Sequence, residues 1–79
     1  MILFCDRMIS EIKSASTETE LKEIVDNSFS RLRAINNSYN EASYVVRMMV
    51  TLRVARLEET ADRASKNIKI AIEIFKQRC

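Results

Sequence analysis

The chain from Ser38 onward reads SYNEASYVVRMMVTLRVARLEETADRASKNIKIAIEIFKQRC, which is more than half of the molecule. Its apolar residues follow one another at steps of four and three, as Val50, Val54, Leu57, Ala61, Ala64, Ile68, Ala71 and Phe75. This spacing is typical of a helix that keeps one face turned toward a partner helix. The stretch therefore predicts one long amphipathic helix over residues 39–78.

The composition favours an all-helical fold. The 79 residues include no glycine and no proline, the two residues that most strongly mark tight turns and strand ends. With 47% hydrophobic and 30% charged residues, the chain is unlike a disordered one. We predict a single small all-α domain spanning residues 1–79. A domain of about this size buries only about 60% of its unfolded surface, so a partner chain would add stability.

Two shorter helices are predicted before the long one, over residues 2–14 and 18–35. The second starts at Thr17-Glu18-Thr19-Glu20, where the threonine hydroxyl and the glutamate carboxylate can cap the first turn. Its apolar stripe is interrupted by the polar Ser28. Residues 38–41 form another candidate capping sequence, and the short connection there predicts an antiparallel helical hairpin.

The polar stretch 58–67 leaves two arrangements of the long helix open. A continuous helix would be about 57 Å long, whereas the second helix covers only about 27 Å of it. We favour continuity because the apolar spacing stays in phase and because Glu59 precedes Arg63 by four residues, a stabilising helical spacing. The alternative is a break near residues 58–67, which would fold the chain into an antiparallel four-helix bundle.

The first half of the long helix is apolar on nearly every side, which is typical of a helix packed on two sides. A second group of large apolar residues lies near the C-terminal end. Because exposed apolar patches mark interaction sites, we predict partner contacts in both regions. The predicted contact residues are Val45, Met48, Met49, Leu52, Ile70, Ile72 and Ile74.

Basic residues gather at the C-terminal end. Residues 63–79 carry five basic residues and one acidic residue, although the whole chain is nearly balanced at 13 and 11. The candidate basic face consists of Arg63, Lys66, Lys69, Lys76 and Arg78. Such a face is suited to nucleic-acid phosphates. Interleaved Asp62 and Glu73 favour a solvated surface that also complements the helix dipole.

The residues needed for common catalytic and metal chemistry are largely missing. The chain has no histidine, the commonest general acid–base group and nitrogen metal ligand. Cys5 therefore has no histidine to activate its thiol. Glu58, Glu59 and Asp62 are flanked by basic residues, which favours ion pairs over cation binding. We expect no enzymatic activity, no cofactor and no metal.

These patterns together predict a protein that binds another macromolecule. Two cysteines, the lack of a signal-peptide pattern and the lack of a long apolar run favour a cytoplasmic protein. We expect a non-enzymatic adaptor, chaperone-like or regulatory subunit that acts through protein–protein interaction, with a homodimer as the default assembly. A nucleic-acid-binding regulator is the alternative, and an immunity-type helical bundle the second. Binding to a membrane surface is the least favoured.

Overall fold

A computed structural model describes residues 2–36 and 38–78 of the chain. Within these residues the protein forms four helices, which are α1 (Ile2–Ser14), α2 (Glu18–Ile35), α3 (Glu41–Glu58) and α4 (Asp62–Lys76). No strand occurs in the part of the chain that is described. The predicted all-α fold class is confirmed.

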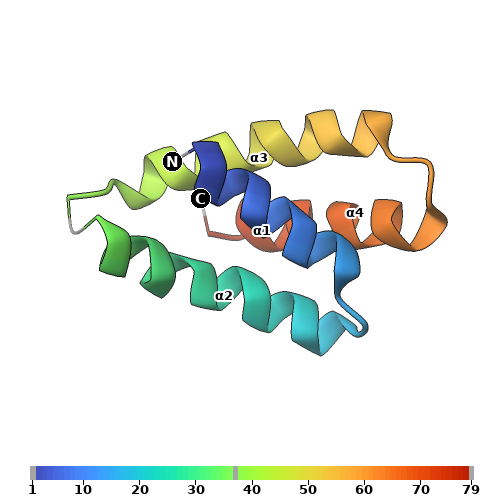
Figure 1. The fold of residues 1–79 in the computed structure, drawn as a ribbon, viewed down its shortest axis with the longest axis horizontal. Coiled ribbons are helices and arrows are strands. Elements are labelled where there is room, and N and C mark those ends of the chain that lie inside the picture. The colour runs from blue at the N-terminus through green and yellow to red at the C-terminus, as the bar shows by residue number, and fades with distance from the viewer. Residues whose placement is uncertain (1, 37, 79) are drawn as a thin grey trace.

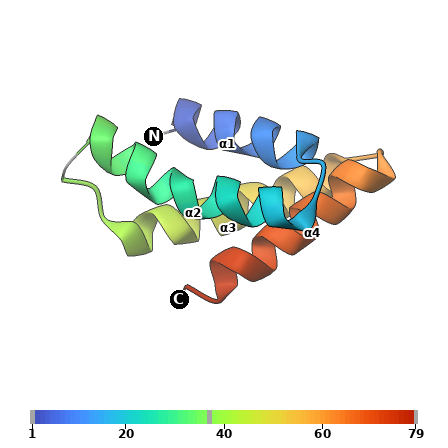
Figure 2. The same ribbon diagram turned by 90° about the horizontal axis from the view of Figure 1, so that it is seen from below.

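The helices form a bundle in which α1 and α4 lie between α2 and α3 (Figure 1). Both α1 and α4 contact each of the other helices. In the view turned by 90°, α1 and α4 lie on opposite sides of the molecule, and α4 crosses its neighbours obliquely (Figure 2). α3 is therefore packed along one side only and has an outer side that no described segment covers.

The prediction of one continuous helix over residues 39–78 is wrong. α3 ends at Glu58 and α4 begins at Asp62, so the alternative break near residues 58–67 is the correct one. α4 then runs back alongside α3 (Figure 1). The longest dimension of the molecule is 36 Å, whereas a continuous helix would be about 57 Å long.

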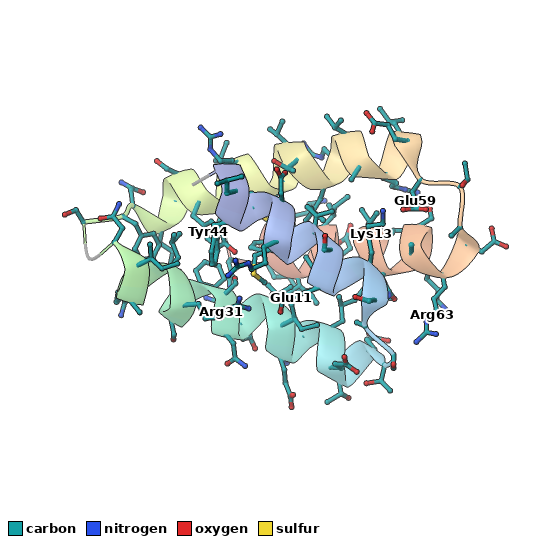
Figure 3. All side chains as sticks on the ribbon, in the orientation of Figure 1. Glu11, Lys13, Arg31, Tyr44, Glu59 and Arg63 are labelled. Carbon is teal, nitrogen blue, oxygen red and sulfur yellow. The ribbon has the colours of Figure 1, made fainter. Side chains whose placement is uncertain are left out.

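Contacts between helices hold the break in place. The carboxylate of Glu59 pairs with the Lys13 ammonium of α1 at 2.6 Å, and the two side chains meet at the end of the bundle (Figure 3). The other oxygen of the Glu59 carboxylate accepts hydrogen bonds from the backbone N–H groups of Thr60 and Ala61 at 3.2 and 3.1 Å. The turn therefore has hydrogen-bond partners although it contains neither glycine nor proline.

Side chains of α4 close the C-terminal end of α1. Asn67 donates its amide N–H groups to the carbonyl oxygens of Ile12, Lys13 and Ala15 at 3.0 to 3.3 Å. Arg63 donates to the same carbonyl oxygen of Ala15 at 3.2 Å. The last carbonyl groups of a helix lack partners within that helix. Here side chains of the neighbouring helix α4 satisfy them. Arg63 donates to Ala15, the residue that follows α1, and does not form the pair with Glu59 that the sequence spacing predicted.

The helix starts agree with the predicted capping sequences in one case and differ in the other. Thr17 caps α2, and its hydroxyl accepts the N–H of Glu20 at 3.0 Å as predicted, whereas the Glu20 carboxylate accepts the N–H of Ser16 at 3.3 Å and not that of Thr17. α3 is capped by Asn40, whose side chain accepts the N–H of Ser43 at 3.1 Å. The long C-terminal segment thus becomes helical at residue 41 instead of residue 39.

The core is centred on Tyr44, which is fully buried at the start of α3. The centroid of its ring lies 5.1 Å from that of Phe29, 5.8 Å from that of Phe75 and 6.0 Å from that of Phe4. These rings come from α2, α4 and α1, so all four helices meet at this residue. Tilted and edge-on aromatic pairs of this kind add stability beyond the area that they bury.

Candidate interaction surface

The partner-contact residues predicted on α3 lie in the core. Val45, Met48 and Leu52 are buried, and Met49 is half-buried against the core. They face the other helices together with Tyr44. We call the buried set Tyr44, Val45, Met48 and Leu52 the inner stripe. Its members hold the bundle together and offer no surface to a partner while the protein is folded.

The predicted contact residues near the C-terminal end have little free surface. Ile72 is buried, and Ile70 and Ile74 are half-buried against the core. The last two also line a shallow groove between α2 and α4. Its other lining residues are polar or charged, namely Glu18, Thr19, Lys22, Glu73 and Gln77. The three isoleucines therefore serve mainly the packing of α4.

The exposed apolar surface of α3 lies on the side opposite the inner stripe. We call it the outer stripe, and it consists of Val46, Val50, Val54 and Leu57. These side chains are 60%, 55%, 50% and 88% exposed. They recur at steps of four, four and three, so they share one face of the helix. Four large apolar side chains on one face form an exposed patch of the kind that marks an interaction site.

Val50, Val54 and Leu57 of the outer stripe belong to the apolar repeat of the sequence. That repeat predicted that they share one continuous helix face with the residues up to Phe75. The break at residues 59–61 separates the two parts. Ala64, Ile68, Ala71 and Phe75 are buried on α4, whereas the part on α3 is exposed. The arginines do not separate the two stripes of α3, because Arg47 lies between Val46 and Met48 and Arg53 lies between Leu52 and Val54. The sequence signal that distinguishes them is side-chain size, since the inner stripe contains Tyr44 and Met48 and the outer stripe contains three valines.

Hollows border the outer stripe along its length. A groove between α1 and α3 is lined by Asp6, Ile9, Val50, Thr51, Val54, Ala55 and Glu58. A second hollow lies along the first half of α3 and is lined by Ala42, Ser43, Val46, Arg47, Val50 and Thr51. The outer stripe is thus a ridge beside grooves, a shape that accepts the side-chain rows of another helix.

The charges around the outer stripe are distributed unevenly. Arg47, Arg53 and Arg56 are exposed on α3 between and beside its apolar residues. Glu58 is the acidic residue at the end of the stripe, and Asp6 of α1 lies across the groove. Any partner must therefore supply an acidic group to the arginines or leave them in water.

The predicted basic face is divided by intramolecular contacts. Arg78 pairs with Asp26 at 3.1 Å and with Glu41 at 3.5 Å, and its guanidinium carbon lies 4.0 Å from the centroid of the Phe29 ring. Arg63 is bonded to the carbonyl oxygen of Ala15, just after α1, as described above. Lys66, Lys69 and Lys76 are exposed, but so are Asp62 and Glu73 on the same helix. The face therefore carries charges of both signs.

The buried polar groups form a structural contact. The hydroxyl of Tyr44 donates to Oγ of Ser28 at 2.6 Å. The Ser28 hydroxyl in turn donates to the carbonyl oxygen of Val25 at 2.6 Å. Burial raises the pKa of Tyr44 to about 12, although the hydrogen bond to Ser28 acts in the opposite direction. Burial also raises the pKa of the Cys5 thiol, with the Arg47 charge opposing it. Both groups are thus held in their neutral forms.

Two further properties bear on the kind of site. Among the described residues, no group of three or more Cys, Asp or Glu side chains is placed to hold a metal ion. None of the described helices combines the length and the apolar character required to cross a bilayer.

Comparison of the chain with protein-family models, with curated proteins and with solved structures found no match.

Proposed function

We propose that this protein is a non-enzymatic helical module that acts through protein–protein interaction, and that the outer stripe of α3 is its contact surface. The observation that carries the proposal is the exposure of Val46, Val50, Val54 and Leu57 on one helix face. Covering an exposed apolar ridge of this kind with another protein is favourable, because it removes apolar surface from water. An adaptor, a regulatory subunit and an immunity-type protein would each use such a surface.

A second copy of the chain is the first partner to test, since closed twofold assemblies are the commonest. Light scattering at concentrations well above the micromolar range should approach twice the 9.2 kDa mass of the chain. Val54→Asp should reduce the mass to that of one chain, because it places a charge within the contact. Since Val54 is half exposed, the variant should keep its helical circular dichroism.

Leu3→Asp is the matched control, because Leu3 is a strongly exposed apolar residue on α1 and not on α3. It should leave the assembled mass unchanged. A wild-type chain that stays monomeric up to millimolar concentration would rule out self-association. Equal effects of the Leu3 and Val54 variants would rule out the outer stripe as the contact.

Nucleic-acid binding is the alternative, and it is supported by the exposure of Lys66, Lys69 and Lys76 on α4. It predicts retention on DNA that weakens with salt. Neutralising the three lysines together should abolish that retention. The interleaved acidic residues and the engagement of Arg63 and Arg78 within the fold make this function the weaker proposal.

A cytoplasmic location also belongs to the proposal. It is supported by Cys5, which is buried as a free thiol, since reduced cysteines are typical of that compartment. Fractionation of the native cell would test it, and recovery of the protein from a secreted or membrane fraction would contradict it.

A further inference from the structure

We propose that the second copy lies with its α3 parallel to α3 of the first, so that Arg53 of each copy faces Glu58 of the other. This inference rests on the proposed self-association and adds its orientation and its charge pairing. The contact consists of the outer stripe and of the residues at its two borders.

The spacing of the exposed residues matches a short parallel coiled coil. Val50, Val54 and Leu57 are separated by steps of four and three, the spacing of successive d, a and d positions. In this register Arg53 occupies the g position before Val54, and Glu58 occupies the e position after Leu57. Residues at g and e border the apolar seam and form salt bridges between the two helices.

Arg53 and Glu58 lie on opposite borders of the outer stripe. An α-helix turns by about 100° per residue, so Arg53 is rotated away from Val54 in one direction and Glu58 is rotated away from Leu57 in the other. A twofold axis parallel to the helices brings each border against the opposite border of the other copy. Each Arg53 then faces an acidic group, and the pair forms twice.

The antiparallel arrangement is less favourable for the same charges. A twofold axis perpendicular to the helices would bring each border against its own copy. Arg53 lies near the middle of the stripe, so the two Arg53 side chains would meet on one border. Glu58 is the only acidic residue in the segment 46–58, and it lies on the other border. Like charges at short range oppose association.

Arg47 limits the length of the contact. It precedes Val54 by seven residues, so it takes the next a position toward the N-terminus. In the parallel dimer the two Arg47 side chains meet at this layer, so their like charges end the apolar seam there and reduce the stability of the contact. We therefore expect a dimer with a dissociation constant of about micromolar magnitude.

A bilayer is a less suitable occupant than a second copy. Interfacial helices carry aromatic and leucine side chains on their apolar face, whereas the outer stripe has three valines and one leucine.

Charge exchange between two variants tests the orientation. Arg53→Glu and Glu58→Arg should each raise the dissociation constant of the dimer at least tenfold, because each variant alone places like charges together. An equimolar mixture of the two should restore the dimer, since the glutamate introduced in one variant would then face the arginine introduced in the other. Analytical ultracentrifugation in dithiothreitol, which keeps the cysteines reduced, measures the association. Circular dichroism should show unchanged helix content.

Arg56→Glu is the matched control because Arg56 is exposed on α3 but takes the c position, away from the seam. It should leave the dissociation constant within a factor of about two. If Arg53→Glu alone leaves the dissociation constant unchanged, the two residues at position 53 face each other, the helices are antiparallel and the inference is wrong. If Val54→Asp dissociates the dimer but neither charge variant does, self-association stands and the parallel pairing fails. Binding to anionic vesicles without self-association would overturn both.

Discussion

Ser28 is a polar residue in the middle of the apolar stripe of α2, and it is fully buried. Its position is explained by a residue that is distant in the sequence, since Tyr44 donates to its hydroxyl at 2.6 Å. The serine O–H in turn donates to the Val25 carbonyl oxygen. A buried hydroxyl without a hydrogen-bond partner destabilises the folded state. Tyr44 and Ser28 avoid this cost because each provides the other with a partner in the core. The periodicity of α2 alone could show only an interruption.

Removal of either hydroxyl should therefore destabilise the bundle. Tyr44→Phe removes one hydrogen bond and should lower the free energy of unfolding by about 1 kcal/mol. Ser28→Ala leaves the tyrosine hydroxyl buried without its acceptor and should cost about 1–3 kcal/mol. Urea denaturation measures both, and the double variant gives their coupling. The exposed Ser30→Ala is the control on the same helix. A Ser28→Ala variant as stable as the wild type would contradict this role.

The buried tyrosine also predicts a loss of stability at alkaline pH. Its pKa is about 12 in the folded state and about 10 in the unfolded state. Its contribution is therefore complete below about pH 10 and is lost as the pH rises toward 12. Two pKa units correspond to about 2–3 kcal/mol. Because lysines titrate in the same range, the quantity to measure is the difference between the wild type and Tyr44→Phe, and parallel profiles would refute the assignment.

At the level of helices, the connection from α3 to α4 is the feature that sets the architecture. Residues 58–67 contain no helix-breaking residue, and their local spacing agrees with a continuous helix. The chain nevertheless turns, because a turn brings the apolar face of α4 onto all three other helices. The Lys13–Glu59 pair and the bonds from Asn67 to the end of α1 add polar contacts at the same end. Tertiary packing here outweighs a local preference, as is usual for helices.

The role of Glu59 is testable through acid stability. The hydrogen bond from Lys13, followed by that from the Ala61 N–H, lowers the pKa of the Glu59 carboxyl. Its contribution is therefore present above the unfolded glutamate pKa of about 4.3 and is lost as the pH falls through the folded value. Glu59→Gln should be less stable than the wild type at neutral pH and should approach it in acid.

Glu23→Gln serves as the control, because Glu23 is exposed on α2. It should leave the acid side of the stability profile unchanged. A Glu59→Gln variant whose difference from the wild type is the same at pH 7 and at pH 3 would show that the ion pair does not support the turn. Thermal unfolding followed by circular dichroism gives both profiles.

For the whole molecule, the choice between the two stripes of α3 decides which surface is available to a partner. Both stripes are apolar, and each has a helical spacing. The fold buries the stripe with Tyr44, Met48 and Leu52, whose larger side chains fill the space between α1, α2 and α4. The valine stripe then lies outside. Burial of the larger apolar side chains stabilises the folded state more, since this stabilisation scales with the apolar area removed from water.

Alanine substitutions in adjacent turns distinguish the stripes. Leu52 is fully buried, so Leu52→Ala should lower the free energy of unfolding by about 2–5 kcal/mol. Val54→Ala, in the outer stripe, should change it by less than about 0.5 kcal/mol at dilute concentration. Urea denaturation of both variants measures the difference. Equal losses would mean that the outer stripe is also packed within one chain.

The sequence by itself determined the helical class, the first two helices and the start of α2. These features depend on interactions between residues a few positions apart, such as the Thr17 cap, and on the lack of glycine and proline. The apolar spacing also showed that the segment after residue 40 has more apolar surface than one contact can cover. Short-range patterns of this kind are present in the chain before it folds.

Only the tertiary structure decided where the last segment breaks and which stripe of α3 is buried. The break brings together residues that are distant in the sequence, such as Lys13 and Glu59, which are 46 positions apart and whose charged groups lie 2.6 Å from each other in the bundle. The buried stripe depends on side-chain volumes contributed by all four helices around Tyr44. A periodic pattern records that a face is apolar. Which of two apolar faces is covered depends on the total free energy of packing, and that is a property of the assembled bundle.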